Sequence, residues 1–176
     1  FHGDGTYIFS HGDIYTGSFK NGKFHGKGEF KDRTGNVYQG DFENDMYNGF
    51  GTYTYNDGSI HDMSIYEGEF VNDRMEGRGI KTWINNYRRY VGEFKNDEPH
   101  GKGILTFLNG NVYEGDWVRN SRHGKGKLTF KDKSFYRGDF YHELMHGKGI
   151  HVSADGCQYE GDWFENERHG EGVFMS

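Results

Sequence analysis

Apolar and polar residues alternate along this chain in short segments that return at a nearly constant spacing. The pattern Tyr-x-Gly-x-Phe/Trp occurs seven times, at intervals of 23 to 28 residues, and starts at Tyr15, Tyr38, Tyr66, Tyr90, Tyr113, Tyr136 and Tyr159. In a β-strand, residues two positions apart point to the same face. Each segment therefore predicts a strand that places a tyrosine, a glycine and a second aromatic ring on one face.

A second pattern, Gly-x-Gly, follows each of these segments and also occurs once before the first. Its first glycines are Gly3, Gly26, Gly49, Gly77, Gly101, Gly124, Gly147 and Gly170. Asn109-Gly110, Asp57-Gly58 and Asp155-Gly156 are strong hairpin signals between the patterns. We therefore expect two short antiparallel strands per repeat and one leading strand near residues 6–9. The predicted fold is all-β, an elongated single-layer antiparallel β-meander of about fifteen strands.

Glycine is a poor strand residue, so its regular recurrence needs a packing reason. We interpret Gly26 and Gly28 as bare positions on the face of Phe30, where a ring of a neighbouring strand lies over the backbone. The predicted core is thus a thin layer of rings laid against glycine. The rings expected to hold its layers are Phe70, Phe94, Trp117, Phe140 and Trp163.

The composition agrees with strands and excludes several classes of protein. A chain of 176 residues with 29 Gly and few Ala and Leu cannot be mostly helical. Its single cysteine excludes an internal disulfide framework, and we expect a cytoplasmic location. No apolar run approaches the length of a membrane span. The chain begins at Phe1 without a methionine, and we expect it to be a piece of a longer protein.

These residues resemble the MORN-repeat family, named for membrane occupation and recognition nexus. The likeness rests on Tyr-x-Gly-Asp/Glu/Ser-Phe/Trp, a turn, and His/Asn/Glu-Gly-x-Gly at a 23-residue period, and it covers residues 1–176. It makes the chain a single array, with a half repeat at 1–14 and repeats that start at the seven tyrosines. Five extra residues around Ser59–Ser64 interrupt the period, and we expect them to bulge out as a loop.

The resemblance implies a scaffold that links membranes, cytoskeletal structures and partner proteins. Arrays of this kind resemble the self-associating MORN scaffolds of protist cytoskeletons, so we expect a homodimer associated with the cytoskeleton and peripheral to a membrane. No enzymatic activity is expected. The segment His142-Glu143-Leu144-Met145-His146 matches H-E-x-x-H, but it spans a predicted turn rather than the helix that such a zinc site requires.

Partner proteins are expected along an aromatic groove on the ring-bearing face. The residues predicted to line it are Tyr53, Tyr55, Trp83, Phe107 and Phe130. Such rings suit an extended segment or an amphipathic helix of another protein. No nucleic acid is expected as a partner, because the chain carries a net charge of -6.

Two further candidate sites each have more than one interpretation. The stretch 119–137 suits anionic phospholipids such as phosphoinositides, or an acidic patch of a second chain. Its basic residues are Arg119, Arg122, Lys125, Lys127, Lys131, Lys133 and Arg137. Cys157, with His151 or Asp155, could join two chains through a disulfide or a shared zinc ion, which is the one cofactor considered. The ordinary alternatives are a solvated basic segment and an exposed thiol without a role.

Overall fold

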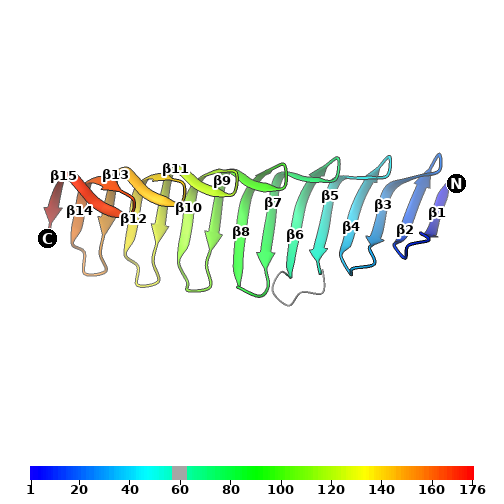
Figure 1. The fold of residues 1–176 in the computed structure, drawn as a ribbon, viewed down its shortest axis with the longest axis horizontal. Helices are drawn as coiled ribbons and strands as arrows, with labels where there is room; N and C mark the ends of the chain where they lie inside the picture. The colour runs from blue at the N-terminus through cyan, green and yellow to red at the C-terminus, as the bar shows by residue number, and fades with distance from the viewer. Residues whose placement is uncertain (57–62) are drawn as a thin grey trace. The chain divides into compact units, whose positions relative to one another are not determined.

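The computed structural model describes residues 1–56 and 63–176, which form fifteen β-strands (Figure 1). The strands are β1 (Gly3–Ile8), β2 (Ile14–Lys20), β3 (Lys23–Lys31), β4 (Val37–Glu43), β5 (Met46–Tyr55), β6 (Ser64–Val71), β7 (Arg74–Trp83), β8 (Arg88–Lys95), β9 (Glu98–Thr106), β10 (Val112–Val118), β11 (Ser121–Thr129), β12 (Phe135–Tyr141), β13 (Leu144–Val152), β14 (Gln158–Phe164) and β15 (Glu167–Met175). They follow one another in chain order in one sheet. The prediction of an all-β, single-layer antiparallel meander is confirmed.

The chain divides into two compact units, and each is described by itself. Unit 1 comprises residues 1–89 and 94–97, and unit 2 comprises residues 90–93 and 98–176. The part of the chain that the structure describes contains no helix long and apolar enough to cross a membrane. The predicted loop around Ser59–Ser64 and the predicted Asp57-Gly58 turn fall on or beside residues 57–62, which lie outside the described residues.

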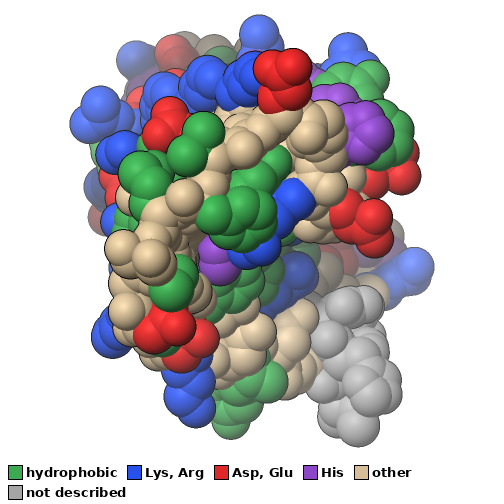
Figure 2. All heavy atoms as spheres, turned by 90° about the vertical axis from the view of Figure 1, so that its left-hand side faces the viewer, with side chains coloured by type: hydrophobic (Ala, Val, Ile, Leu, Met, Phe, Trp, Pro, Cys, Tyr) green, Lys and Arg blue, Asp and Glu red, His purple; other side chains and the backbone are tan. Residues whose placement is uncertain are grey.

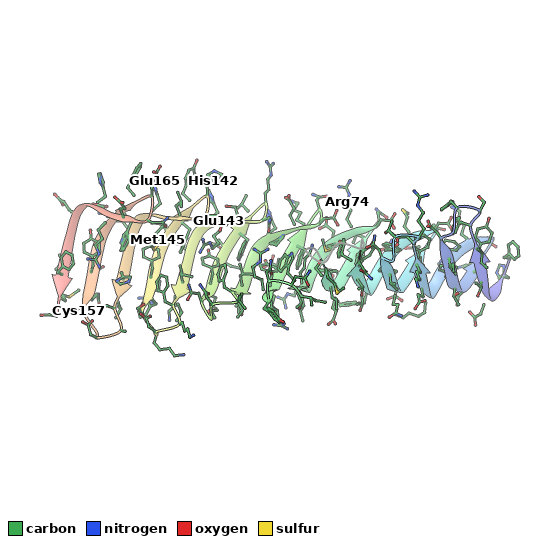
Figure 3. All side chains as sticks on the ribbon, turned by 60° about the horizontal axis from the view of Figure 1, so that its bottom comes forward. Arg74, His142, Glu143, Met145, Cys157 and Glu165 are labelled. Carbon is green, nitrogen blue, oxygen red and sulfur yellow. The ribbon has the colours of Figure 1, made fainter. Side chains whose placement is uncertain are left out.

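Two-residue turns join the strands within each repeat. Both central residues have positive φ, for example 53° at Asn44 and 73° at Asp45, and 44° at His142 and 74° at Glu143. This is the type I′ turn, whose twist matches that of the strands it joins. Figure 3 shows His142 and Glu143 at one end of the strands in unit 2. Cys157 lies at the opposite end of the strands, where the longer turns are.

The longer turns connect one repeat to the next. Gly110 and Gly156 have φ of 86° and 92° in two of them. In each turn a backbone hydrogen bond closes the loop, from Gly110 N–H to Phe107 O at 2.9 Å and from Gly156 N–H to Ser153 O at 3.0 Å. The Asn109-Gly110 and Asp155-Gly156 turn predictions are confirmed, and glycine suits these positions because it adopts a positive φ at little steric cost.

The first tyrosine of each repeat forms the core, with an exposed fraction between 0% and 5% at all seven positions. At Tyr38 the ring lies over Gly51 of the paired strand, so that a Cβ on Gly51 would come within 2.5 Å of the tyrosine Oη. The Tyr38 hydroxyl donates a hydrogen bond to the Asp41 carbonyl oxygen at 2.8 Å. Its ring meets that of Phe42 edge to face, with centroids 5.1 Å apart. The predicted packing of rings against bare backbone is confirmed.

The two positions of Gly-x-Gly require glycine for different reasons. The prediction that both glycines make room for a ring is wrong for the first. Gly26 has a φ of 69° and lies at an irregularity in the pairing of β2 with β3. Its positive φ turns the Cβ position toward Ser18, at 3.5 Å, rather than toward the tyrosine. Gly28 does lie under the Tyr15 ring, where a Cβ would come within 2.7 Å of it. The alternation of faces thus holds for the second glycine but not for the first, which lies in a β-bulge.

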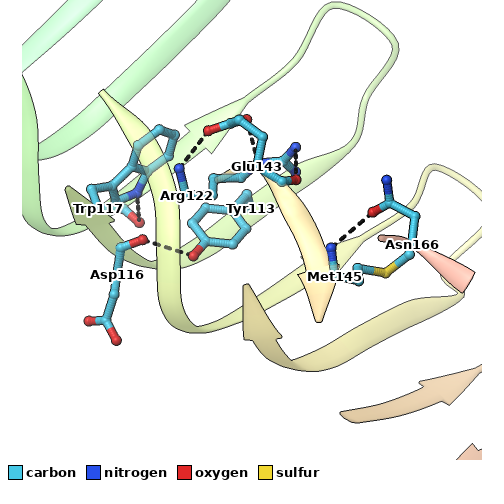
Figure 4. A network of polar contacts seen from close by, with 8 residues as sticks. Tyr113, Asp116, Trp117, Arg122, Glu143, Met145 and Asn166 are labelled. Atoms are coloured by element: carbon cyan, nitrogen blue, oxygen red, sulfur yellow. Dashed lines mark hydrogen bonds and ion pairs between the residues drawn. The ribbon is translucent and has the colours of Figure 1, made fainter. Parts of the chain in front are cut away.

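The type I′ turns also tie successive repeats together. The backbone N–H of Asp73 donates to the Tyr47 carbonyl oxygen at 3.0 Å, and its Oδ1 accepts the Tyr47 N–H at 2.7 Å. In unit 2, Asn166 holds Met145 in the same way, at 3.0 and 2.9 Å (Figure 4). In five turns the second residue, Asp45, Asp73, Asp97, Glu143 or Asn166, therefore has a second role besides its φ, because its side-chain oxygen satisfies a backbone donor of the preceding repeat.

On the face opposite the tyrosines, carboxylates join neighbouring strands. Asp116 accepts the backbone N–H of Lys125 at 2.9 Å and forms an ion pair with the Lys102 ammonium. Asp139 accepts the N–H of Lys148 at 3.0 Å and lies 2.6 Å from the Lys125 Nζ. The acidic residue that recurs in the middle of the tyrosine pattern is thus a structural bridge between repeats.

This bridge predicts a loss of stability in acid. Burial alone would raise the pKa of Asp116, but the Lys102 ammonium and the Lys125 N–H lower it below its usual value of 3.8. A lowered pKa in the folded state stabilises the fold at a pH above the unfolded pKa, and this contribution disappears as the pH falls through the folded pKa. We expect Asp116→Asn to be less stable than the wild type at about pH 6, and by a smaller margin at about pH 2. Urea unfolding at the two pH values measures this, and a difference that does not shrink in acid would contradict it.

Candidate partner-binding site

Unit 1 carries a row of half-buried rings beside its tyrosine core, which we call the aromatic strip. Its members are Phe9, Phe30, Tyr47, Tyr53, Tyr55 and Trp83. The ring centroids of Phe9 and Phe30 are 6.0 Å apart, and those of Phe30 and Tyr47 are 6.5 Å apart. Tyr53 continues the row at 6.0 Å from Tyr47 and 4.4 Å from Tyr55. The first five rings therefore form a connected surface, and Lys81, which lies near both Tyr55 and Trp83, links Trp83 to it.

The register of the repeat explains why these rings share a face. Tyr53 follows the second glycine of its repeat by two residues and Tyr55 by four, so both point to the side of the buried tyrosines. Tyr53 pairs with Tyr38 on one neighbouring strand and with Tyr66 on the other. The sheet has a single layer, so these rings keep an exposed edge instead of packing under a second sheet.

The tyrosine hydroxyls of the strip are hydrogen-bond donors at neutral pH. Burial raises the pKa of Tyr55 to about 12, and burial also raises the pKa values of Tyr47 and Tyr53. Core tyrosines use their hydroxyl on a backbone carbonyl, as Tyr66 does to Glu69 at 2.9 Å. Within residues 1–56 and 63–176, no hydroxyl of the three strip tyrosines has such a partner.

Two cations border the strip at its β7 end. The Lys81 Nζ lies 4.8 Å from the centroid of the Tyr55 ring and 5.5 Å from that of Trp83. The Arg88 guanidinium carbon lies 4.8 Å from the centroid of Trp83. Burial lowers the pKa of Lys81, while Asp97 acts in the opposite direction. Sequence reasoning missed both cations, although Lys81 stands at the register position that Phe30 and Tyr53 hold in other repeats.

Unit 2 contains the other two predicted groove residues, with polar or charged neighbours in place of rings. Phe107 is half-buried, and the guanidinium carbon of Arg122 lies 5.9 Å from its centroid. Phe130 is half-buried, and its centroid is 6.5 Å from that of His151. Burial lowers the pKa of His151, and the charge of Arg168 acts in the same direction. Both rings lie on the tyrosine face of unit 2, and their role in binding stays a prediction.

The rings predicted to hold the layers are buried, between 3% and 6% exposed. They are Phe70, Phe94, Trp117, Phe140 and Trp163. The two tryptophans also satisfy their indole N–H, from Trp117 to the Gly103 carbonyl oxygen at 3.2 Å and from Trp163 to the Gly149 carbonyl oxygen at 3.1 Å. These side chains therefore belong to the core and not to a binding surface.

The last strand shows how a cation replaces a ring in this packing. All residues of β15 are exposed, and Figure 2, which faces this end, shows hydrophobic side chains next to basic ones. The guanidinium carbon of Arg168 lies 5.0 Å from the centroids of both Tyr159 and Phe174. In the first full repeat the same register position holds Phe24, which stacks on Tyr15 with centroids 3.7 Å apart.

The basic residues of 119–137 do not gather at one place. Arg122 lies on the tyrosine face and pairs with Glu143 at 2.8 Å, whereas Lys125 lies on the opposite face and pairs with Asp139. The Lys127 Nζ lies 4.5 Å from the Phe135 ring centroid. The others are Arg119 in the turn after β10, Lys131 and Lys133 in the turn after β11, and Arg137 on β12. Binding of anionic lipids by this stretch stays a prediction.

The cysteine lies exposed in the turn between β13 and β14. The Cys157 N–H donates to Asp155 Oδ1 at 3.2 Å, whereas His151 lies on the tyrosine face, with its centroid 6.2 Å from that of Trp163. No group of three or more His, Cys, Asp or Glu suited to a metal ion occurs within the described ranges. A zinc or disulfide link between two chains, and the homodimer itself, stay predictions.

The H-E-x-x-H match falls on a turn and a strand. His142 and Glu143 are the central residues of a type I′ turn, and His146 lies in β13. The Glu143 carboxylate is engaged by Arg122, and the His146 carbonyl oxygen accepts a hydrogen bond from the Tyr136 hydroxyl at 3.2 Å. The segment thus lacks the helix on which the zinc-binding form of the motif depends.

The hairpins, their tyrosine core and their fixed register define an array of β-hairpin repeats. The MORN repeat matches seven segments of the chain, namely residues 15–37, 38–60, 66–86, 90–112, 113–135, 136–158 and 159–176. The chain therefore belongs to the MORN-repeat family. Each matched segment begins at one of the seven core tyrosines. A comparison with curated proteins gives no match.

Distant likenesses to solved structures include two proteins of different kinds. The TCP domain of SAS-4 (dCPAP) of Drosophila melanogaster, in complex with a proline-rich motif of Ana2 (dSTIL), is 13% identical, and the alignment covers 98% of this chain and 89% of that chain, with a TM-score of 0.45. A streptogramin B lyase is 12% identical over 94% of this chain and 70% of that chain, with a TM-score of 0.20. Both TM-scores are below 0.5, so neither likeness informs the function of this chain.

Proposed function

We propose that this chain is a non-enzymatic scaffold that binds partner proteins along the aromatic strip of unit 1. The observation that carries the proposal is a connected row of half-buried rings whose tyrosine hydroxyls have no partner in the described part of the chain. A role in protein interaction also fits the MORN-repeat family, to which the chain belongs.

The strip has the physical properties of a protein-binding surface. Tyrosine and tryptophan rings bury a large area on contact and lose little conformational entropy, and they dominate the energy of many interfaces. The rings stand on paired strands of a sheet, so they are ordered before the partner arrives. The strands β3 to β7 are four spacings apart, about 19 Å, which is the length of about six residues of an extended peptide.

The test is a selection of short peptides from a displayed random library on the immobilised chain, followed by affinity measurements with the selected peptides. We expect Tyr53→Ala, Tyr55→Ala and Trp83→Ala each to weaken binding about tenfold or more, because each removes a ring at the centre of the contact. Isothermal titration calorimetry or fluorescence polarisation gives the dissociation constants.

Tyr141→Ala is the matched control. Tyr141 is 53% exposed, and it contacts His123 and His146 in unit 2, whereas the strip belongs to unit 1. We expect this variant to bind the selected peptides as the wild type does. Equal losses for Tyr141→Ala and the strip variants, with all variants folded, would contradict the proposal. Failure of the selection to yield any peptide that depends on the strip would contradict it as well.

A further inference from the structure

Lys81 is a lysine at a register position that holds an apolar or aromatic residue in the other repeats. The residue two positions after the second glycine is apolar or aromatic in the other six repeats, namely Phe30, Tyr53, Leu105, Leu128, His151 and Phe174. The lysine side chain takes this position on the tyrosine face and is half-buried. Its ammonium lies over Tyr55, 4.8 Å from the ring centroid. A charge is thus built into a surface that is otherwise made of rings.

The charge of Lys81 is not neutralised within the described residues, in contrast to other cations of the molecule. Arg122 on the tyrosine face has the Glu143 carboxylate at 2.8 Å, and Lys27 on the opposite face has Asp41 at 2.8 Å. Among residues 1–56 and 63–176, no carboxylate oxygen lies within ion-pair distance of the Lys81 Nζ. The aromatic faces next to it attract the cation but accept no conventional hydrogen bond from its ammonium.

A second cation lies on the same indole. The guanidinium carbon of Arg88 is 4.8 Å from the Trp83 centroid, and its Nε donates to the Asn86 Oδ1 at 3.3 Å. Among the described residues, the charge of Asp97 acts on Lys81, and the Asp97 Oδ1 accepts the Met75 N–H at 2.8 Å. Two positive charges therefore flank an indole that is exposed at its edge.

We propose that Lys81, Trp83 and Arg88 form an acidic-residue subsite, which recognises an aspartate or glutamate side chain of an extended peptide flanked by apolar residues. The carboxylate supplies the charge partner that Lys81 and Arg88 do not have among residues 1–56 and 63–176, and the apolar neighbours cover Trp83 and Tyr55. A partly desolvated site strengthens the attraction between the charges, and complementarity of charge selects the partner. This inference rests on the proposed function of the strip and names the chemistry of its partner.

The experiment uses an array of nine-residue synthetic peptides with Leu, Pro and Ser at the variable positions and with the central residue fixed as Glu or as Gln. The full chain is labelled and applied to both halves of the array. We expect the wild type to prefer the Glu peptides by about tenfold over their Gln counterparts. Lys81→Leu should keep the binding of Gln peptides and lose this preference. Leucine is chosen because Leu105 and Leu128 show that the register position accepts it.

Lys27→Gln is the control, because it removes a lysine of unit 1 on the opposite face, and it should leave the preference unchanged. A preference for Glu that survives in Lys81→Leu would overturn the inference, and so would its absence in the wild type. If peptides bind through Tyr53 and Trp83 with equal affinity for Glu and Gln, the scaffold proposal stands and the acidic-residue subsite is rejected. If no peptide binds in a manner that depends on the strip, both are rejected.

Discussion

Gly51→Ala is expected to destabilise unit 1 by about 3 kcal/mol, one of the largest effects of a single methyl group in this molecule. A Cβ at Gly51 would come within 2.5 Å of the Tyr38 Cε2 and Oη. Tyr38 is fully buried and its hydroxyl is bonded to the Asp41 carbonyl oxygen, so the ring has no free space into which it can move. Chemical denaturation followed by the fluorescence of Trp83 measures the free energy of unfolding.

Gly5→Ala is the matched control for this prediction. Gly5 is also the second glycine of a Gly-x-Gly pattern, but a Cβ there would meet only Phe19, at an ordinary contact distance of 3.4 Å. We expect Gly5→Ala to change stability by less than about 1 kcal/mol. If both substitutions had the same small effect, the glycines would not be required by the tyrosine rings, and the account of the core would be wrong.

The sequence predicted the fold because its signals are local and repeated. Alternating residues, such as Tyr15, Gly17 and Phe19, identify strands directly, and Asn109-Gly110 and Asp155-Gly156 identify turns. The first glycine of Gly-x-Gly escaped this reasoning, because a bulge with positive φ cannot be distinguished from a regular strand by composition alone.

The candidate site could be predicted only in part. Alternation placed Tyr53, Tyr55 and Trp83 on the tyrosine face, where the structure has them half-buried. It did not give the contacts of Lys81 and Arg88 with Trp83, because these depend on where two flexible side chains lie, one of them on the same strand as Trp83 and the other beyond the next turn. Alignment of the repeats by register would have singled out Lys81, which is a lysine at a position that is otherwise apolar or aromatic in most repeats. The hydrogen bonds between successive turns escaped detection because each joins residues of different repeats.

Tyr66→Ala should destabilise unit 1 by about 4 kcal/mol, whereas Tyr53→Ala should cost less than about 2 kcal/mol. Tyr66 has no exposed surface, and its centroid lies 5.1 Å from that of Phe70 and 4.9 Å from that of Phe94. Its removal leaves a cavity that the surrounding strands cannot fill. Tyr66→Phe removes only the hydrogen bond to Glu69 and should cost about 1 kcal/mol. Urea unfolding of the three variants gives these values.

The comparison of Tyr66 with Tyr53 also tests the function. The two residues face each other in the pairing of β5 with β6, yet one is fully buried and the other keeps an exposed edge. If the strip is a binding surface, Tyr53→Ala weakens peptide binding much more than it weakens folding, and Tyr66→Phe affects neither strongly. Equal destabilisation by Tyr53→Ala and Tyr66→Ala would mean that the strip rings are core residues, because a ring that is needed for folding is not free to contact a partner.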